Sequence, residues 1–253
     1  MSFFNRILNF SQEAVRQREQ RRSQRYPTGA AFPLQATLTL SGRTPATAWT
    51  GTLTDLSAHG TSVRLPAGAA ATRGEPGRLR LAVEEQQLEV AGTIANLRAH
   101  PDHTICGFEL QFPEFNTHKN YMQLLEAVAL GAMLAPADAR FVRQDAPGLH
   151  KEKYSGEADT ELILWREAPG GAIDSFEFRM NDCFVRGHRR ASGLEIYTQE
   201  TVKDELKSGY TQPTVHPNTA TQEEIRRLYR WVVPNFAPAV PDDVRRFLAG
   251  FAN

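Results

Sequence analysis

Residues 34–112 carry the pattern that most limits how this chain can fold: short runs of alternating apolar and polar residues, separated by turn residues. Alternation with a period of two is typical of strands that bury one face. Many short strands with turn signals between them indicate an antiparallel sandwich or a small barrel, so we expect a mainly β fold. The expected strands are Leu34–Leu40, Thr47–Leu53, Gly60–Leu65, Arg78–Val83, Leu88–Leu97 and His103–Phe112.

A helix is expected after these strands, over Glu114–Leu134. Its apolar residues recur at three- and four-residue steps, which places them near one face of a helix. They are Phe115, Tyr121, Leu124, Leu125, Val128 and Met133.

Two short motifs accompany the β pattern: the first lies before it in the sequence, and the second lies within it. Residues 21–25 read Arg-Arg-Ser-Gln-Arg and contain R-x-x-x-R, and residues 55–60 read Asp-Leu-Ser-Ala-His-Gly, which is D-x-S-x-x-G. Each motif alone is weak. The arginines could form a solvated basic face of a helix, and a turn that starts with Asp and Ser often caps itself. Their order, and an interval long enough for two strands, make the combination informative.

The two motifs and the strand pattern together resemble a PilZ domain, a receptor module for the bacterial second messenger cyclic di-GMP. The resemblance covers about residues 18–134. It implies a six-stranded antiparallel β-barrel with a following helix, and a cyclic di-GMP site in place of a cofactor or metal. The implied output of such receptors is control of motility, exopolysaccharide or virulence.

The resemblance also implies which residues bind the ligand. Arg21 and Arg25 match the arginine pair of the family. Arg18 and Arg22 form a second R-x-x-x-R, and Arg22 is a further candidate. The later register, Arg21 and Arg25, is preferred because an extended strand normally begins soon after the second arginine. In the family, the residue just before the pair influences how many ligands bind. Here that residue is Gln20, so the resemblance does not decide between one bound ligand and a stacked pair. The second motif adds Asp55, Ser57 and Gly60.

These residue types suit a dianion that carries two guanines. The planar guanidinium of arginine pairs bidentately with phosphate or with guanine O6 and N7, and it stacks on a base face. A carboxylate such as that of Asp55 accepts hydrogen bonds from guanine N–H groups. The hydroxyl of Ser57 can bond to a phosphate or to the backbone, and Gly60 allows a positive φ or a close ligand approach.

Composition sets limits on the class of protein. The chain has 253 residues with zero formal net charge, so extended binding of a nucleic-acid polymer is not indicated. Cys106 and Cys183 are far apart and are expected to be buried, reduced thiols. No stretch is long and apolar enough for a membrane span, and the N-terminus lacks the apolar core of a signal peptide. We expect a cytoplasmic protein.

The N-terminal segment, residues 1–20, is expected to be an amphipathic helix. Phe3, Phe4, Ile7 and Leu8 begin an apolar stripe at three- and four-residue steps, and the chain turns polar and basic from Arg16. The stripe could dock on the protein itself or on a partner. A basic amphipathic helix at a membrane surface is a second interpretation.

The C-terminal part is expected to hold a linker, residues 135–155, and a small α+β domain, residues 156–253. Strands are expected at Glu161–Trp165, Ile173–Met180, Cys183–His188 and Gly193–Thr198, so that the domain has three or four strands. Two helices are expected, the first opening at Thr221 with a capping pattern and the second at Asp242–Phe251.

Three functions compete on these observations. The first is a cyclic di-GMP receptor whose C-terminal domain is an output or interaction module for a protein partner of unknown identity. The second is a protein-interaction adaptor that has the fold without depending on the ligand. An enzyme is the third and weakest, because Asp174, Glu177, Asp182 and His188 fall at turns and strand ends. They have no paired base and nucleophile, no metal-ligand spacing and no phosphate loop.

Overall fold

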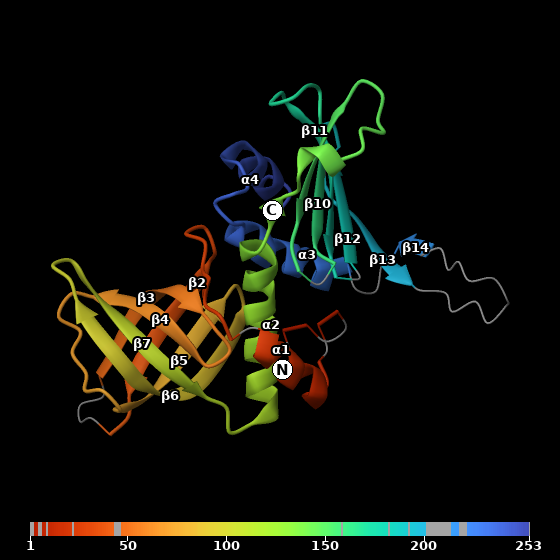
Figure 1. Ribbon diagram of the computed structural model, residues 1–253. Coiled ribbons are helices and arrows are strands. Elements are labelled where there is room, and N and C mark those ends of the chain that lie inside the picture. The colour runs from red at the N-terminus through yellow and green to blue at the C-terminus, as the bar shows by residue number, and fades with distance from the viewer. Residues whose placement is uncertain are drawn as a thin grey trace. The chain divides into compact units, whose positions relative to one another are not determined.

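The computed structural model describes the chain in two compact units, Met1–Ala129 and Leu130–Asn253 (Figure 1). Within them, the described residues are 3–4, 7–8, 10–21, 23–42, 47–157, 159–181, 183–191, 193–200, 214–217 and 222–252.

The first unit is a closed antiparallel barrel. The strands pair in the order β1-β3-β2-β5-β6-β7-β4, and an additional pairing of β3 with β4 closes six of them into a barrel, with the short β1 added to β3. This confirms the expected fold. The strands are β1 (Tyr26–Pro27), β2 (Leu34–Leu40), β3 (Thr47–Leu56), β4 (Gly60–Pro66), β5 (Pro76–Val83), β6 (Gln86–Ala99) and β7 (His103–Gln111).

Alternation along the strands builds the barrel core. In β2, Leu34, Ala36, Leu38 and Leu40 are buried, while the residues between them are exposed or half-buried. Successive side chains of a strand point to opposite faces, so the inward set of each strand fills the interior. The outward set stays free to carry polar groups.

Helix α2 (Phe115–Ala132) follows the barrel. Its apolar residues are buried as expected, among them Tyr121, Leu124 and Leu125. The helix also carries a buried polar face, on which Gln123 is 0 % exposed and Glu126 is 1 % exposed. Buried polar groups need partners, and the N-terminal segment supplies them.

The expectation of one helix over residues 1–20 was wrong. Helix α1 spans only Gln12–Arg21, and the described residues before it are not helical. The Gln123 side chain binds this part of the backbone: its Nε2 donates to the carbonyls of Phe4 (2.6 Å) and Leu8 (2.6 Å), and its Oε1 accepts from the Phe4 N–H (3.2 Å). Contacts from α2 therefore replace the bonds of a first helical turn.

The N-terminal segment lies beside α2 (Figure 1), and burial and charge also hold it there. Phe4, Leu8 and Phe10 are buried. The Arg18 guanidinium lies 4.0 Å from the centre of the Phe10 ring, and its Nε lies 3.9 Å from Oε2 of Glu126. The apolar stripe that the sequence shows is thus covered by the protein. Among the described residues, no helix is long and apolar enough to cross a membrane.

The second unit contains a seven-stranded antiparallel sheet in the order β14-β13-β12-β11-β10-β9-β8. Its strands are β8 (Ala135–Pro136), β9 (His150–Ser155), β10 (Glu161–Arg166), β11 (Ile173–Met180), β12 (Cys183–His188), β13 (Glu195–Glu200) and β14 (Thr214–Pro217). Its helices are η1 (Ala139–Phe141), α3 (Gln222–Val232), η2 (Val233–Asn235) and α4 (Asp242–Ala249).

The α+β class of this unit is confirmed, but two expectations about it were wrong. The expectation of three or four strands is too low, and residues 135–155 are not only a linker, because β8 and β9 lie within them. Strand β9 was not predicted from the sequence because only Tyr154 of its six residues is buried. A strand near the edge of a sheet buries little, so its sequence needs no clear alternation of apolar residues.

Aromatic side chains form much of the core of the second unit. Phe176 and Phe178 of β11 contact rings from the helical part, including Tyr229 at 6.2 and 6.3 Å between centroids. Arg166 of β10 is 3 % exposed, and it contacts Oε1 of Glu152 at 2.9 Å and Oδ2 of Asp243 at 2.7 Å. This buried guanidinium ties β9 and β10 to helix α4.

Candidate functional site

The arginine segment, residues 21–25, leads directly into β1, and β1 lies beside the second motif. Tyr26 pairs with Leu56 and Pro27 pairs with Asp55. Thr28 extends the contact through its N–H to the carbonyl of Thr54 (3.1 Å) and its hydroxyl to the carbonyl of Leu53 (2.6 Å). Backbone pairing therefore brings two motifs that are far apart in sequence to the same edge of the barrel.

Arg25 makes the side-chain contact between the two motifs. Its Nη1 donates to Oδ1 of Asp55 and, at 3.1 Å, to the hydroxyl oxygen of Ser62. The Arg25 side chain is 51 % exposed and that of Asp55 is 25 % exposed. Such a partly solvated pair contributes little to stability, so both groups remain available to a ligand.

A β-bulge directs Asp55 outward. The register between β3 and β4 shifts between Leu53 and Asp55, so that Asp55 faces Ser62. Bulges re-aim side chains and occur near functional sites. Here the bulge puts the carboxylate on the same outer face as Ser62.

Ser57 stabilises the turn from inside. It is 5 % exposed. Its hydroxyl donates to the carbonyl of Gly60 (3.0 Å) and accepts from the Gly60 N–H (3.2 Å), while its own N–H donates to the Gly60 carbonyl (2.8 Å). Of the two roles open to this hydroxyl, the structure shows the bond to the backbone.

Gly60 allows a close approach of neighbouring atoms. A Cβ at this position would lie 3.1 Å from the carbonyl oxygen of Phe108 and 3.4 Å from Nη2 of Arg25. Its φ is not among the positive values of the chain. The glycine therefore makes room for Arg25 above the turn and does not supply a left-handed conformation.

Tyr121 supports the turn from α2. Its hydroxyl donates to the carbonyl of Ser57 at 2.7 Å, and the side chain is fully buried. Burial raises the pKa of this phenol, and the negative charge of Asp55 raises it further. The group therefore stays a neutral donor that fixes the turn to the helix.

Four of the six predicted site residues come together in this way: Arg25, Asp55, Ser57 and Gly60. Arg21 is the last residue of α1, but its side chain lies outside the described part of the structure, and Arg22 lies wholly outside it. The sequence reasoning missed Ser62 and Tyr121. Ser62 could have been found, because alternation from Gly60 along β4 places it on the outer face. The contact of Tyr121 has no sequence signal.

A second cluster lies beside the turn. Glu19 of α1 has its Oε1 3.4 Å from Nδ1 of His59 and 4.0 Å from Nε2 of His118. His118 stacks on Phe112, with 4.5 Å between the ring centroids. Burial lowers the pKa of His118; the charge of Glu19 opposes this shift, and His59 adds to it.

The lowered pKa of His118 predicts an acid-sensitive contribution to stability. The unfolded chain takes up this proton near the ordinary pKa of 6.5, whereas the folded protein resists it. The contribution is therefore fully present above pH 6.5 and is lost as the pH falls through and below that value. Thermal unfolding at pH 8 and pH 5.5 should show a larger loss for the native protein than for His118→Gln. An equal loss in both proteins would contradict the prediction.

The described residues of the second unit show no assembled catalytic group. Glu177 pairs with Arg186 at 2.8 Å, and Asp174, His188 and Arg190 line an open hollow. Asp182 lies outside the described residues. Across the described part of the chain, no group of three or more His, Cys, Asp or Glu side chains is placed to hold a metal ion.

Both cysteines are free and buried, as expected. Burial raises the pKa of the Cys106 thiol to about 11, which keeps it protonated and unreactive at neutral pH.

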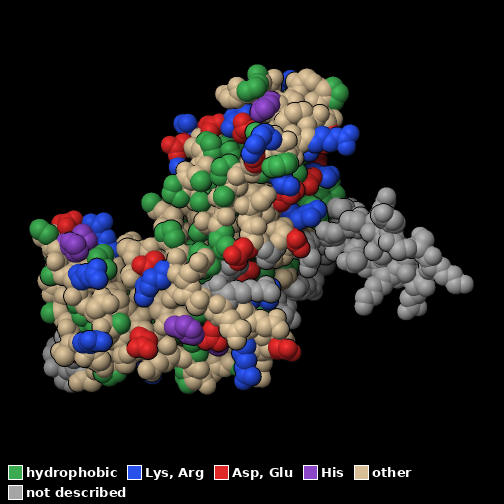
Figure 2. All heavy atoms as spheres, in the orientation of Figure 1, with side chains coloured by type: hydrophobic (Ala, Val, Ile, Leu, Met, Phe, Trp, Pro, Cys, Tyr) green, Lys and Arg blue, Asp and Glu red, His purple; other side chains and the backbone are tan. Residues whose placement is uncertain are grey.

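On the face seen in Figure 2, basic and acidic side chains are interspersed over the barrel without a broad patch of one sign. Among the described side chains, the contact of Arg25 with Asp55 is a local site of mixed charge, which suits a small charged ligand better than a long polyanion.

Two features indicate the class of protein. The first is the closed six-stranded antiparallel barrel with a following helix, and the second is the outward-facing Arg25, which contacts Asp55 in the turn before β4. The model of the PilZ domain family matches residues 19–129. These residues are therefore a PilZ domain, and PilZ domains are a family of cyclic di-GMP receptors.

Solved structures resemble the chain more weakly. The crystal structure of the PilZ domain of CeSA from a cellulose-synthesizing bacterium is 19% identical, covers 41% of this chain and 95% of that chain, and has a TM-score of 0.33. The crystal structure of the Borreliella burgdorferi PlzA protein in complex with c-di-GMP is 9% identical, covers 95% of this chain and 99% of that chain, and has a TM-score of 0.33. No curated protein matches the chain.

Proposed function

We propose that this protein is a cyclic di-GMP receptor that passes the level of the second messenger to a protein partner. The observation that carries the proposal is the contact of Arg25 with Asp55 and Ser62 on the outer face of a PilZ barrel. The contact joins a residue that pairs with phosphate or guanine to one that accepts from guanine N–H groups.

The ligand would enter between the arginine segment and the Asp55–Gly60 turn. Arg25 can turn its exposed fork from Asp55 to a phosphate or to a guanine O6 and N7 edge. Asp55 then becomes free to accept from a guanine. Arg21 ends α1 and is proposed as the second arginine of the pair, with Arg22 as the alternative.

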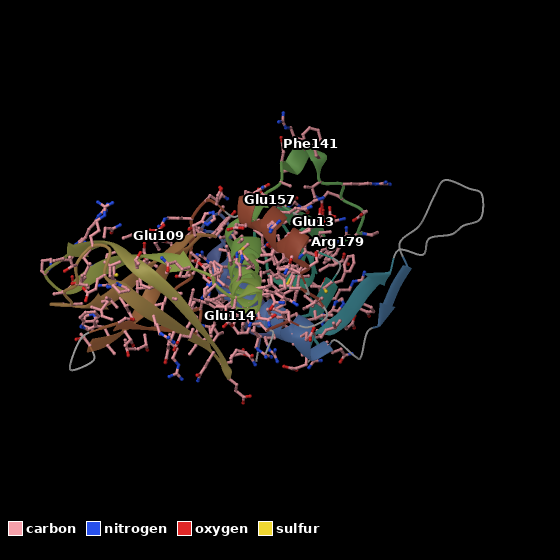
Figure 3. The ribbon with its side chains drawn as sticks, turned by 90° about the horizontal axis from the view of Figure 1, so that it is seen from below. Glu13, Glu109, Glu114, Phe141, Glu157 and Arg179 are labelled. Atoms are coloured by element: carbon pink, nitrogen blue, oxygen red, sulfur yellow. The ribbon has the colours of Figure 1, made fainter. Side chains whose placement is uncertain are left out.

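The second unit is proposed as the output or interaction module. It has its own sheet and an aromatic core, and it presents Phe141 of η1 with 84% of its surface exposed (Figure 3). Capture of the ligand would restrain the arginine segment, and with it α1, and a partner would recognise the changed protein. We propose the cytoplasm as the site of action, in keeping with two buried, free thiols.

Calorimetry tests the proposal directly. Titration of the whole protein should show binding of cyclic di-GMP and much weaker binding of GMP and GTP, because only the cyclic dinucleotide presents two guanines and two phosphates together. An adaptor that does not depend on the ligand is the alternative. It would give no heat at high protein concentration while still capturing its protein partner.

A further inference from the structure

Four residues line up across four adjacent strands on the outer face of the barrel (Figure 1). Asp55 of β3 pairs with Ser62 of β4, and Ser62 pairs with Gly107 of β7. Gly107 in turn pairs with Asn96 of β6. Neighbouring strands lie about 4.8 Å apart, so this cross-strand row extends roughly 10 Å beyond Ser62, away from its contact with Arg25.

A β-bulge stands at each end of the cross-strand row. The register of β3 and β4 shifts between Leu53 and Asp55, and that of β6 and β7 shifts between Ile94 and Asn96. Ile94 is buried and pairs with the buried Phe108, whereas Asn96, beyond the bulge, is exposed. Bulges re-aim side chains and are frequent next to functional sites. The second bulge thus adds a carboxamide to the row in which the first places a carboxylate.

The side chain of Asn96 lies over Gly107. A Cβ at Gly107 would come within 2.7 Å of Nδ2 and 3.0 Å of Oδ1 of Asn96. Any larger residue at this position would therefore push the amide aside. Because β7 separates β6 from β4, the glycine leaves the amide of Asn96 above the strand that lies between it and Ser62.

The side chains that flank the cross-strand row differ in charge. On one side, Arg64 and Arg98 both pair with the half-buried Ile105. Arg64 contacts Asp102 at 3.0 Å and keeps half of its side chain exposed. On the other side, Glu109 of β7 is exposed. Residues two apart in a strand share a face, so the phosphates of an anionic ligand on the row would face the arginines, and its bases would lie over the row.

We infer that the ligand site extends along the cross-strand row and that Asn96 binds the second guanine of cyclic di-GMP. The inference rests on the proposed function, in which the ligand is held at Arg25 and Asp55. The Watson–Crick edge of guanine places the acceptor O6 beside the donor N1–H. A carboxamide offers one donor beside one acceptor, so Asn96 can form two hydrogen bonds with that edge. The neighbouring Ile105 offers apolar surface to the base.

Calorimetry with cyclic di-GMP on the full chain tests the inference. Asn96→Ala should raise the dissociation constant about two- to tenfold, because hydrogen bonds between neutral groups are lost. Gln87→Ala is the matched control, since Gln87 is also an exposed carboxamide on β6 but lies outside the row. Its dissociation constant should equal that of the native protein. Both variants should unfold near the native temperature, because both side chains are exposed.

Nuclear magnetic resonance separates a direct contact from an indirect effect. The side-chain NH2 signals of Asn96, identified by their loss in Asn96→Ala, should shift when the native protein is saturated with cyclic di-GMP. The corresponding signals of Gln87 should stay in place.

The outcomes separate this inference from the proposed function. Native affinity in Asn96→Ala, or Asn96 signals that do not move while the native protein binds, would overturn the role of Asn96 and leave the receptor intact. Absence of binding by the native protein and both variants, with normal thermal unfolding, would overturn the proposed function and this inference with it.

Discussion

Replacement of Arg25 by alanine is expected to weaken cyclic di-GMP binding about ten- to a hundredfold. A charge-assisted hydrogen bond to the ligand is worth about 1.5–3 kcal/mol, and each 1.4 kcal/mol is a factor of about ten in the dissociation constant. The dissociation constant of Arg25→Lys should lie between those of the native protein and Arg25→Ala, because lysine keeps the charge but lacks the planar fork that pairs bidentately. Calorimetry on the three proteins measures the effect.

Arg78→Ala is the matched control for this experiment. Arg78 is also an exposed arginine paired with a carboxylate, that of Glu89, but it lies on β5, which β2 separates from β3. Its loss should leave the affinity unchanged. The Arg25–Asp55 pair is partly solvated, so Arg25→Ala should also keep the native unfolding temperature within a few degrees. Full affinity in Arg25→Ala would place the ligand elsewhere.

Replacement of Gln123 by methionine is expected to lower the free energy of unfolding by about 2–4 kcal/mol. The side chain is fully buried and makes three hydrogen bonds to the backbone of Phe4 and Leu8. Methionine has a similar length but removes all three bonds, and each hydrogen bond contributes about 0.5–1.5 kcal/mol net. Urea denaturation gives the stability, and hydrogen exchange over residues 3–10 should become faster.

Gln87→Met provides the comparison, because Gln87 is exposed on β6 and surface substitutions usually change stability by less than about 0.5 kcal/mol. If Gln123→Met were as stable as Gln87→Met and exchanged at the native rate, α2 would not hold the N-terminal segment through this side chain. Because that segment leads into α1, the experiment also tests how the arginine segment is supported.

The barrel could be predicted from the sequence because the pattern that indicates its strands lies within short, continuous segments. In β2 and β5 every second residue is buried, and this period of two is written directly in the order of residues. The two motifs were recognisable for the same reason, since each spans only a few consecutive positions. Helix α2 was predicted from its apolar spacing, but its buried Gln123 was not, because a polar residue on a helix normally faces water.

Tertiary structure decided how these local pieces meet. Arg25 reaches Asp55 only because β1 pairs with β3, and Ser62 joins them only because a bulge shifts the register by one residue. Glu19 meets His59 and His118 across three elements that are far apart in the chain.

Contacts between residues distant in the chain also explain the two wrong predictions, the N-terminal helix and the linker in place of β9. The N-terminal stripe predicted a helix, but side-chain contacts from α2 hold the described residues before Gln12 in another conformation. Strand β9 shows no clear alternation because it lies next to the short edge strand β8 and buries little. The sequence by itself determined which segments alternate and which residues are candidates for the ligand site. Only the tertiary structure decided which of them touch, because pairing register and packing depend on residues distant in the chain.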